Sequence, residues 1–217
     1  MNQKTRPPAG MDAWSFAEID GNLRSLGQLR EYPKYTDKPK AGRLLIKASD
    51  FKLTAPEYWV EGIIGKNALT FRVGASGACK TFAATDLATS IALGVDYHGR
   101  KVQQGRVVIS AGEGLDGQVA RLAASAQHKG KTLEDAGVYL AQKTIIFSDE
   151  NAITALCQEI EEHHKGKIGL IVIDTLARAF VGSDENSVKD MSLFIHQRDN
   201  LREPFGCSVV VAHHSGH

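Results

Sequence analysis

The feature that most constrains this chain is a short glycine-bearing segment between a predicted strand and a predicted helix. Residues 69–73 are apolar or β-branched apart from Arg72, which is typical of a strand. Residues 81–93 are rich in alanine and leucine, with apolar side chains from Phe82 onward at helical spacing, and Gly94 follows as a stop signal. A strand, a tight turn and a helix start in this order predict an α/β fold with an anion-binding turn.

The turn itself departs by one residue from the phosphate-binding pattern G-x-x-x-x-G-K-[ST]. In this pattern the free N–H groups at the helix start bind phosphate oxygens, the lysine reaches the β- and γ-phosphates, and the hydroxyl ligates Mg²⁺. An ordinary strand-to-helix turn is the alternative. The predicted nucleotide-binding residues are Gly74, Ala75, Ser76, Gly77, Ala78, Cys79, Lys80 and Thr81.

The departure is Cys79, which stands where the pattern has glycine. Its N–H can still bind phosphate, but its side chain occupies a place of close backbone approach. If the position requires the conformation that favours glycine, strain of about 1–3 kcal/mol follows. Two interpretations remain open: a weakened but working site, or a chain that keeps the fold and has lost hydrolysis.

Composition places few limits on what this protein binds. The chain has 217 residues, 42% hydrophobic and 24% charged, which is typical of a globular protein. The net charge of +1 gives no global attraction for nucleic acid. The first ten residues lack the apolar core of a signal peptide, no apolar run is long enough to span a membrane, and the three cysteines lack metal-type spacing. We expect a cytoplasmic protein with reduced thiols.

The chain divides by composition into two parts. Residues 1–40 are rich in proline and charge, and we expect a partly disordered arm there. Residues 41–217 are expected to form one domain, with an edge strand at 43–47 and Trp59 as the anchor of the segment before the first core strand.

The second part alternates predicted strands and helices, which indicates a mostly parallel sheet with helices on both faces. The continuous apolar runs 170–173 and 209–212 are typical of strands buried on both sides. The predicted strands are 69–73, 106–110, 144–147, 170–173 and 208–212. The predicted helices are 81–93, 116–128, 152–164 and 188–201.

Polar side chains follow three of these strands. Asp174 ends an apolar strand, as does the acid that holds Mg²⁺ in many ATPases; the alternative is a cap for the next turn. Glu113 follows another strand, where a carboxylate can activate water, or can simply favour a helix start. His213 and His214 end the last strand, where one could sense a γ-phosphate; a shared metal is disfavoured because neighbours on a strand point to opposite sides.

Taken together, these motifs resemble the RecA-like ATPases of the AAA superfamily, and within them the RepA-type replicative helicases of plasmids and phages. The resemblance covers about residues 43–217. It rests on the turn at 74–81, on 111–114 with Arg121, on 172–179, on 184–187 and on 213–216.

The resemblance implies roles for individual residues. Glu113 would be the catalytic base, Lys80 would hold phosphate, and Thr81 and Asp174 would hold Mg²⁺. His213 or His214 would be the sensor, with the last strand between the phosphate-loop strand and the Asp174 strand. Arg121 and Arg178 would lie at subunit contacts.

The resemblance also implies ATP and Mg²⁺ as ligands, a homo-oligomeric ring, single-stranded DNA as a partner and no membrane. The chain ends at His217, where the family continues, so we expect a shortened relative. We expect an ATP-binding ATPase related to replicative helicases, hydrolysing weakly or only on assembly. The alternative is a non-catalytic nucleotide-binding or ring-interaction module. A small-molecule kinase is disfavoured because no arginine-rich lid follows the first helix.

Overall fold

The computed structural model describes residues 47–48, 56–112, 114–164, 168–180 and 187–214. Residues Glu57–His217 form one compact unit, and the fold below is that of this unit. The predicted arm, and all but Lys47 of the predicted edge strand, lie outside the described residues.

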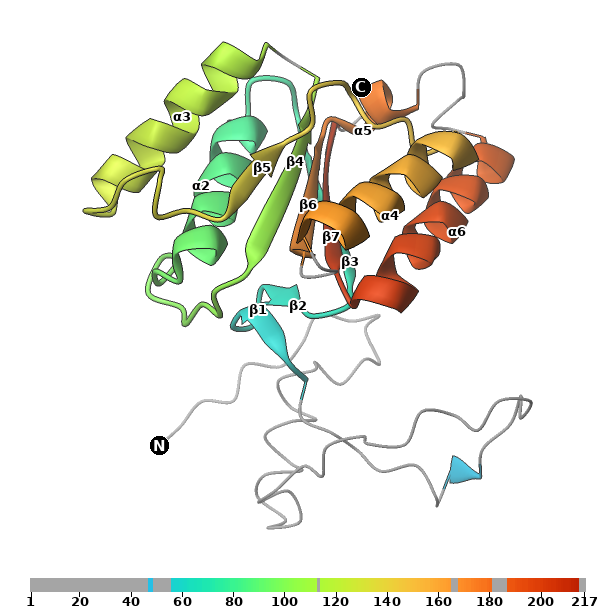
Figure 1. The fold of residues 1–217 in the computed structure, drawn as a ribbon, viewed down its shortest axis with the longest axis horizontal. Coiled ribbons are helices and arrows are strands. Elements are labelled where there is room, and N and C mark those ends of the chain that lie inside the picture. The colour runs from blue at the N-terminus through green and yellow to red at the C-terminus, as the bar shows by residue number, and fades with distance from the viewer. Residues whose placement is uncertain (1–46, 49–55, 113, 165–167, 181–186, 215–217) are drawn as a thin grey trace, which may run out of the picture. The chain divides into compact units, whose positions relative to one another are not determined.

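The described residues of this unit form twelve helices and strands (Figure 1). The strands are β1 (Tyr58–Val60), β2 (Ile64–Gly65), β3 (Leu69–Gly74), β4 (Arg106–Ala111), β5 (Val138–Leu140), β6 (Ile168–Asp174) and β7 (Ser208–His214). The helices are α2 (Lys80–Leu93), α3 (Leu115–His128), α4 (Glu150–His164), α5 (Leu176–Ala179) and α6 (Val188–Phe205).

The core is a five-stranded parallel sheet in the order β3-β7-β6-β4-β5. The prediction of a parallel sheet with helices on both faces is therefore confirmed. The last strand lies between β3 and β6, as the resemblance implied. A separate antiparallel pair, β1 and β2, precedes β3.

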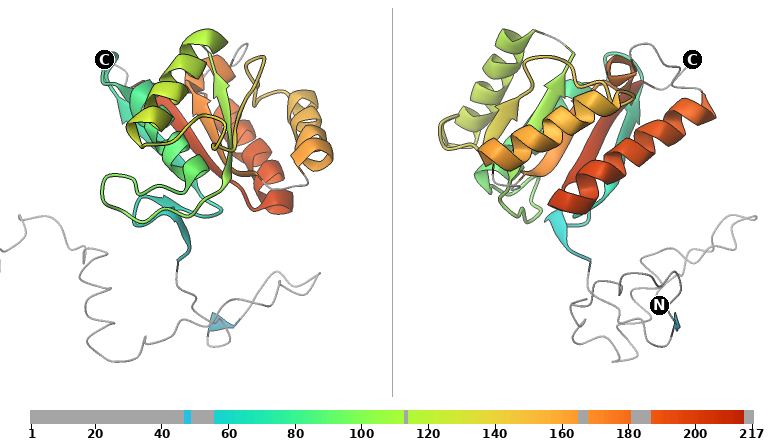
Figure 2. Two further views of the ribbon diagram at one scale, coloured as in Figure 1. Left: turned by 60° about the vertical axis from the view of Figure 1, so that its left-hand side comes forward. Right: turned by 45° about the vertical axis from the view of Figure 1, so that its right-hand side comes forward.

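Two hydrophobic clusters cover the two faces of the sheet. Successive residues of β6 alternate between them: Ile171 and Ile173 face the cluster of α4, α5 and α6, and Leu170 and Val172 face the cluster of α2. This is the period-two alternation of a strand buried on both sides. Figures 1 and 2 show α2 and α3 on one face and α4 and α6 on the other.

One predicted strand is wrong. Residues 144–147 are irregular, and the fifth strand is Val138–Leu140, which pairs with β4. Phe147 is fully buried and packs on Phe194, with 5.3 Å between the ring centroids. The Ile145 N–H donates a hydrogen bond to Ser110 Oγ. This apolar run therefore fills the core as a loop, which periodicity alone cannot distinguish from a strand.

Trp59 fastens the β1–β2 pair to the sheet, as predicted for an anchor. A Cβ added to Gly105 or to Gly169 would meet the Trp59 ring at 2.5 Å, so both glycines leave room for the indole. The indole Nε1 donates to Ser208 Oγ (3.2 Å), and this hydroxyl donates to Gly65 O (2.9 Å). One buried serine therefore joins β7 to the segment before β3.

Candidate functional site

The turn between β3 and α2 has the geometry of a phosphate-binding loop. Gly77 has φ +78°, a conformation that residues with a side chain rarely adopt. The first helical hydrogen bond runs from Ala83 N to Cys79 O (3.0 Å). The N–H groups of Lys80, Thr81 and Phe82 precede it and are free of helical partners by the geometry of a helix start. They are donors suited to phosphate oxygens.

Cys79 caps this helix in the left-handed region, with φ 55° and ψ 27°. The position therefore has the conformation that favours glycine, and a side chain there costs about 1–2 kcal/mol. This fits the sequence-based expectation of strain at the replaced glycine. The thiol is exposed and lines the pocket described below.

The Lys80 ammonium lies over the loop and uses all three of its donors. It donates to Gly74 O (2.8 Å) and Ala75 O (2.8 Å), and it lies 3.0 Å from His214 Nδ1. The third contact requires His214 Nδ1 to carry no proton, because an ammonium only donates. The lysine is thus held at the mouth of the loop by backbone and by the end of β7.

The register of the sheet brings four strand ends to one level. Gly74 pairs with His214, Asp174 pairs with Ala212, and Ala111 pairs with Asp174. Parallel strands place their carboxyl ends at the same edge, where ligands of open α/β sheets bind. Asp174 and His214, at the ends of β6 and β7, therefore lie at this edge of the sheet.

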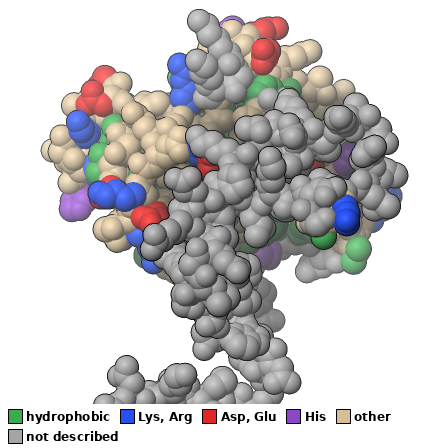
Figure 3. Space-filling model, turned by 90° about the horizontal axis from the view of Figure 1, so that it is seen from below, with side chains coloured by type: hydrophobic (Ala, Val, Ile, Leu, Met, Phe, Trp, Pro, Cys, Tyr) green, Lys and Arg blue, Asp and Glu red, His purple; other side chains and the backbone are tan. Residues whose placement is uncertain are grey.

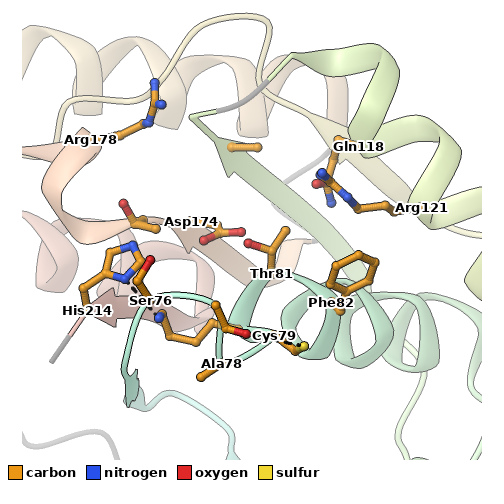
Figure 4. A pocket seen from close by; sticks show the side chains of 14 residues that line it. Ser76, Ala78, Cys79, Thr81, Phe82, Gln118, Arg121, Asp174, Arg178 and His214 are labelled. Atoms are coloured by element: carbon orange, nitrogen blue, oxygen red, sulfur yellow. Dashed lines mark hydrogen bonds between the residues drawn. The ribbon is translucent and has the colours of Figure 1, made fainter.

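These strand ends border a pocket of about 360 Å³ (Figure 4), within the range of ligand-binding cavities. Its lining comes from the loop, α2, α3, α5 with its N-cap, and the ends of β4, β6 and β7. The lining residues are Ser76, Gly77, Ala78, Cys79, Lys80, Thr81, Phe82, Ala111, Gln118, Arg121, Asp174, Thr175, Arg178 and His214.

Asp174 and Thr81 fit the requirements of a Mg²⁺ site. Asp174 Oδ1 is buried and has no hydrogen-bond partner among the described residues. Figure 4 shows its side chain and that of Thr81 turned toward the same space. A carboxylate and a hydroxyl supply the oxygen ligands that Mg²⁺ prefers. Thr175, not Asp174, is the N-cap of α5, so the capping alternative does not account for this carboxylate.

The two histidines separate as strand geometry requires. His214 lines the pocket, whereas the side chain of His213 does not belong to its lining. The described residues hold no group of three or more His, Cys, Asp or Glu side chains that could hold a metal ion. Of the pair, His214 is therefore the candidate sensor.

Arg121 and Arg178 both line the pocket. The Arg121 guanidinium lies over the Phe82 ring, 5.6 Å from its centroid. Arg178 occupies space beside Gly112, where a Cβ would overlap its side chain. Their predicted role at subunit contacts stays a prediction, and so does the role of Glu113, which lies outside the described residues.

Sequence reasoning did not assign four lining residues to the site: Phe82, Ala111, Gln118 and Thr175. Phe82 was expected on the buried face of the first helix, but its side chain is 61% exposed. The buried face of α2 is instead built from Ala84, Leu87, Ala88 and Ile91. A Phe directly after the lysine and threonine, outside that face, was the signal available in the sequence.

The fold and the loop together define a P-loop nucleotide-binding protein with a RecA-like core. A family model described as an AAA domain matches residues 35–217, which is most of the chain. The chain therefore belongs to this AAA domain family, whose members are nucleotide-binding ATPases that usually use Mg²⁺ and often assemble into oligomers. A search among curated proteins found no match. None of the described helices is both long enough and apolar enough to cross a membrane.

Proposed function

We propose that the chain binds Mg-ATP in this pocket and is an ATPase related to the replicative helicases. The observation that carries the proposal is the meeting of Lys80, Thr81 and Asp174 around one cavity at the carboxyl edge of the sheet. A cationic donor and a hydroxyl at a helix start, with a carboxylate at a nearby strand end, are what a metal-bound triphosphate requires.

Each side chain has a definite role in this proposal. Lys80 exchanges its contact with His214 for β- and γ-phosphate oxygens, and Thr81 and Asp174 would hold Mg²⁺, directly or through water. Bound Mg²⁺ would neutralise charge on the phosphate oxygens. Glu113 takes a proton from water, whose oxygen attacks the γ-phosphorus while ADP leaves with the bridging oxygen. His214 contacts the γ-phosphate from the end of β7.

The helicase relationship, a ring of identical subunits and single-stranded DNA as a partner rest on the motif resemblance. In the view of Figure 3, acidic and basic side chains are interspersed over the face drawn in colour. A net charge of +1 gives the molecule as a whole no attraction for DNA, so the proposed DNA contacts would be local ones. Arg121 and Arg178, at the pocket, would then reach the nucleotide of a neighbouring subunit or of their own.

A second function is favoured by Cys79. Because this residue adopts a left-handed conformation in the phosphate-binding loop, the loop is strained before any nucleotide binds. A strained loop is sufficient for a non-catalytic module that binds nucleotide weakly and joins a ring of catalytically active subunits. Mixing the chain with a catalytically active relative and measuring ATPase activity separates the two: a module lowers the relative's turnover per subunit, and an active ATPase does not.

The deciding experiment is Mg-ATP binding by the chain and by its Lys80→Ala variant. If the proposal is right, nucleotide at about 100 times Kd stabilises the native chain by about 2.7 kcal/mol, and the variant loses this shift. Lys101→Ala is the matched control, since Lys101 is an exposed lysine paired with Asp96 and absent from the pocket lining. Equal nucleotide shifts in the chain and in Lys80→Ala would remove the site.

A further inference from the structure

Phe82 is an aromatic side chain in an unusual place. It is the third residue of α2, directly after the phosphate-binding Lys80 and Thr81, and its side chain is 61% exposed. Most of α2 is buried, with nine of its residues from Ala84 to Leu93 in the core. An exposed ring that lines the pocket at the polar start of this helix is not required for packing the helix on the sheet.

The ring does not stand alone. The planar Arg121 guanidinium of α3 lies over it, with 5.6 Å between the guanidinium carbon and the ring centroid. Arginine over an aromatic ring is a favourable cation–π arrangement, and it fixes both groups relative to each other. The helices that carry the two residues pack together, and a hydrogen bond from Gln118 Nε2 to Thr85 Oγ1 (3.0 Å) joins them one turn further on. The pair is therefore set on a rigid part of the fold.

The pocket has a direction. Figure 4 shows His214 at one side and Phe82 with Arg121 at the opposite side, with Thr81 and Asp174 between them. Lys80 Nζ lies at the His214 side, 3.0 Å from Nδ1. A triphosphate whose terminal phosphate meets Lys80, His214 and Asp174 therefore runs toward Phe82, and its ribose and base follow the α-phosphate past that ring.

We propose that Phe82 and Arg121 form a stacking platform for the nucleobase of the bound nucleotide. This inference rests on the proposed nucleotide site and assigns its base-binding end. Stacking uses the π-face that every base has, and neither group reads base edges in a fixed pattern. The platform therefore gives affinity for the base with little choice among bases, and the larger rings of ATP and GTP bind more tightly than those of CTP and UTP.

The test compares Mg-ATP with Mg-tripolyphosphate, which has the phosphates and no base. Isothermal titration calorimetry gives both Kd values for the chain, Phe82→Ala, Phe82→Trp and Tyr58→Ala. Tyr58 is the matched control, an exposed aromatic residue on β1 that does not line the pocket. We expect Phe82→Ala to weaken ATP binding by about tenfold and to leave tripolyphosphate binding unchanged. Phe82→Trp restores ATP binding, and Tyr58→Ala changes neither.

Several results would overturn the platform while leaving the phosphate site intact. One is ATP binding no tighter than tripolyphosphate binding in the unaltered chain. Another is an equal loss of both ligands in Phe82→Ala, which would mean that the ring only shapes the loop. A third is unchanged ATP affinity with altered sedimentation in Phe82→Ala, which would make the ring a protein contact. If the unaltered chain binds neither ligand, the proposed function falls, and the platform with it.

Discussion

Lys80 and His214 lie 134 positions apart in the sequence, yet the lysine Nζ and the histidine Nδ1 are 3.0 Å apart. The contact exists because Gly74 and His214 are register partners at the ends of adjacent parallel strands. The ammonium already uses two loop carbonyls, so His214 is the acceptor that an incoming phosphate can replace without disturbing the loop.

His214→Ala should therefore weaken ATP binding more than ADP binding. A hydrogen bond to a terminal phosphate, less the Lys80 contact it replaces, is worth about 1 kcal/mol, or about fivefold in Kd. Calorimetric titration of both nucleotides measures the difference, and His213→Ala, one residue earlier and outside the pocket lining, is the control. Equal losses for ATP and ADP would contradict a γ-phosphate role.

Cys79→Gly should relieve backbone strain in the phosphate-binding loop. A side chain in the left-handed region costs about 1–2 kcal/mol, and glycine loses about 0.5–1 kcal/mol through the entropy of the unfolded chain. The net change in the free energy of unfolding is therefore small and favourable, about 0.5 kcal/mol, with tighter nucleotide binding. Ala78 does not have a positive φ, so Ala78→Gly relieves no strain. This variant should reduce the free energy of unfolding by about 0.5–1 kcal/mol. Urea unfolding of both variants gives the comparison, and a Cys79→Gly less stable than Ala78→Gly would show that the thiol is favourable there.

The three cysteines should differ sharply in alkylation. Cys79 is exposed, whereas burial raises the pKa of the Cys207 thiol to about 12 and also raises the pKa of Cys157. Because thiolates are the reacting species, iodoacetamide should modify Cys79 first and leave Cys207 unmodified in the native chain. Mg-ATP should slow the modification of Cys79, and mass spectrometry of peptides measures each site. Unchanged labelling of Cys79 at saturating nucleotide would place the ligand elsewhere.

Acid should weaken the contact between α2 and α3. The Asp86 carboxylate on α2 binds Lys129 Nζ (2.6 Å) and the Ser125 hydroxyl (3.0 Å). Burial alone would raise the pKa of Asp86, but the hydrogen bond and charge of Lys129, with smaller effects of Ser125 and His98, outweigh it and lower the pKa. The stabilisation is therefore complete above the unfolded-state pKa of about 3.9 and is lost as the pH falls through the lower folded-state value.

Asp86→Asn should consequently reduce the free energy of unfolding by about 1 kcal/mol at neutral pH, because the pair is only partly screened by solvent. Its deficit relative to the unaltered chain should shrink below pH 4. Asp96→Asn, which affects only an exposed pair with Lys101, is the control and should show almost no deficit. A deficit for Asp86→Asn that stays constant down to pH 3 would contradict the assignment.

The Trp59 anchor gives a prediction about packing. Gly169→Ala places a Cβ within 2.5 Å of the ring, whose Nε1 is hydrogen-bonded to Ser208 and resists displacement. Overpacking of this kind costs about 1–3 kcal/mol. Gly114→Ala has open space and is the control. Thermal unfolding should show a fall in Tm of several degrees for Gly169→Ala alone, and equal Tm values for both variants would mean that the indole moves freely.

Much of the fold followed from the sequence because its strands are long, apolar and bounded by clear signals. β6 and β7 were expected at 170–173 and 208–212, and the structure extends them to Ile168–Asp174 and Ser208–His214. At their carboxyl ends the polar residues Asp174, His213 and His214 extend the predicted apolar runs, since hydrogen bonding to the neighbouring strand does not depend on side-chain polarity. β5 could not be found, because its three residues are less apolar than the buried loop that follows them.

The site was predictable where a residue acts through its position at a strand or helix end. Lys80, Thr81, Asp174 and His214 all meet at the pocket for that reason. Phe82 was wrongly expected on the buried face of α2, because a single apolar residue does not show which side of a helix it occupies. Which of two neighbouring histidines enters the pocket also required the register of β7, which no local pattern contains.

That register makes the interior of β7 intolerant of changes in length. Inserting one residue between Ser208 and Ala212 would carry His213 into the position opposite Gly74 and turn the valine side chains from one cluster toward the other. The number of residues in β7 thus determines whether His214 lies beside Gly74 at the pocket. We therefore expect length variation among related chains to gather in the connections between elements, and the spacing from Ser208 to His214 to be kept.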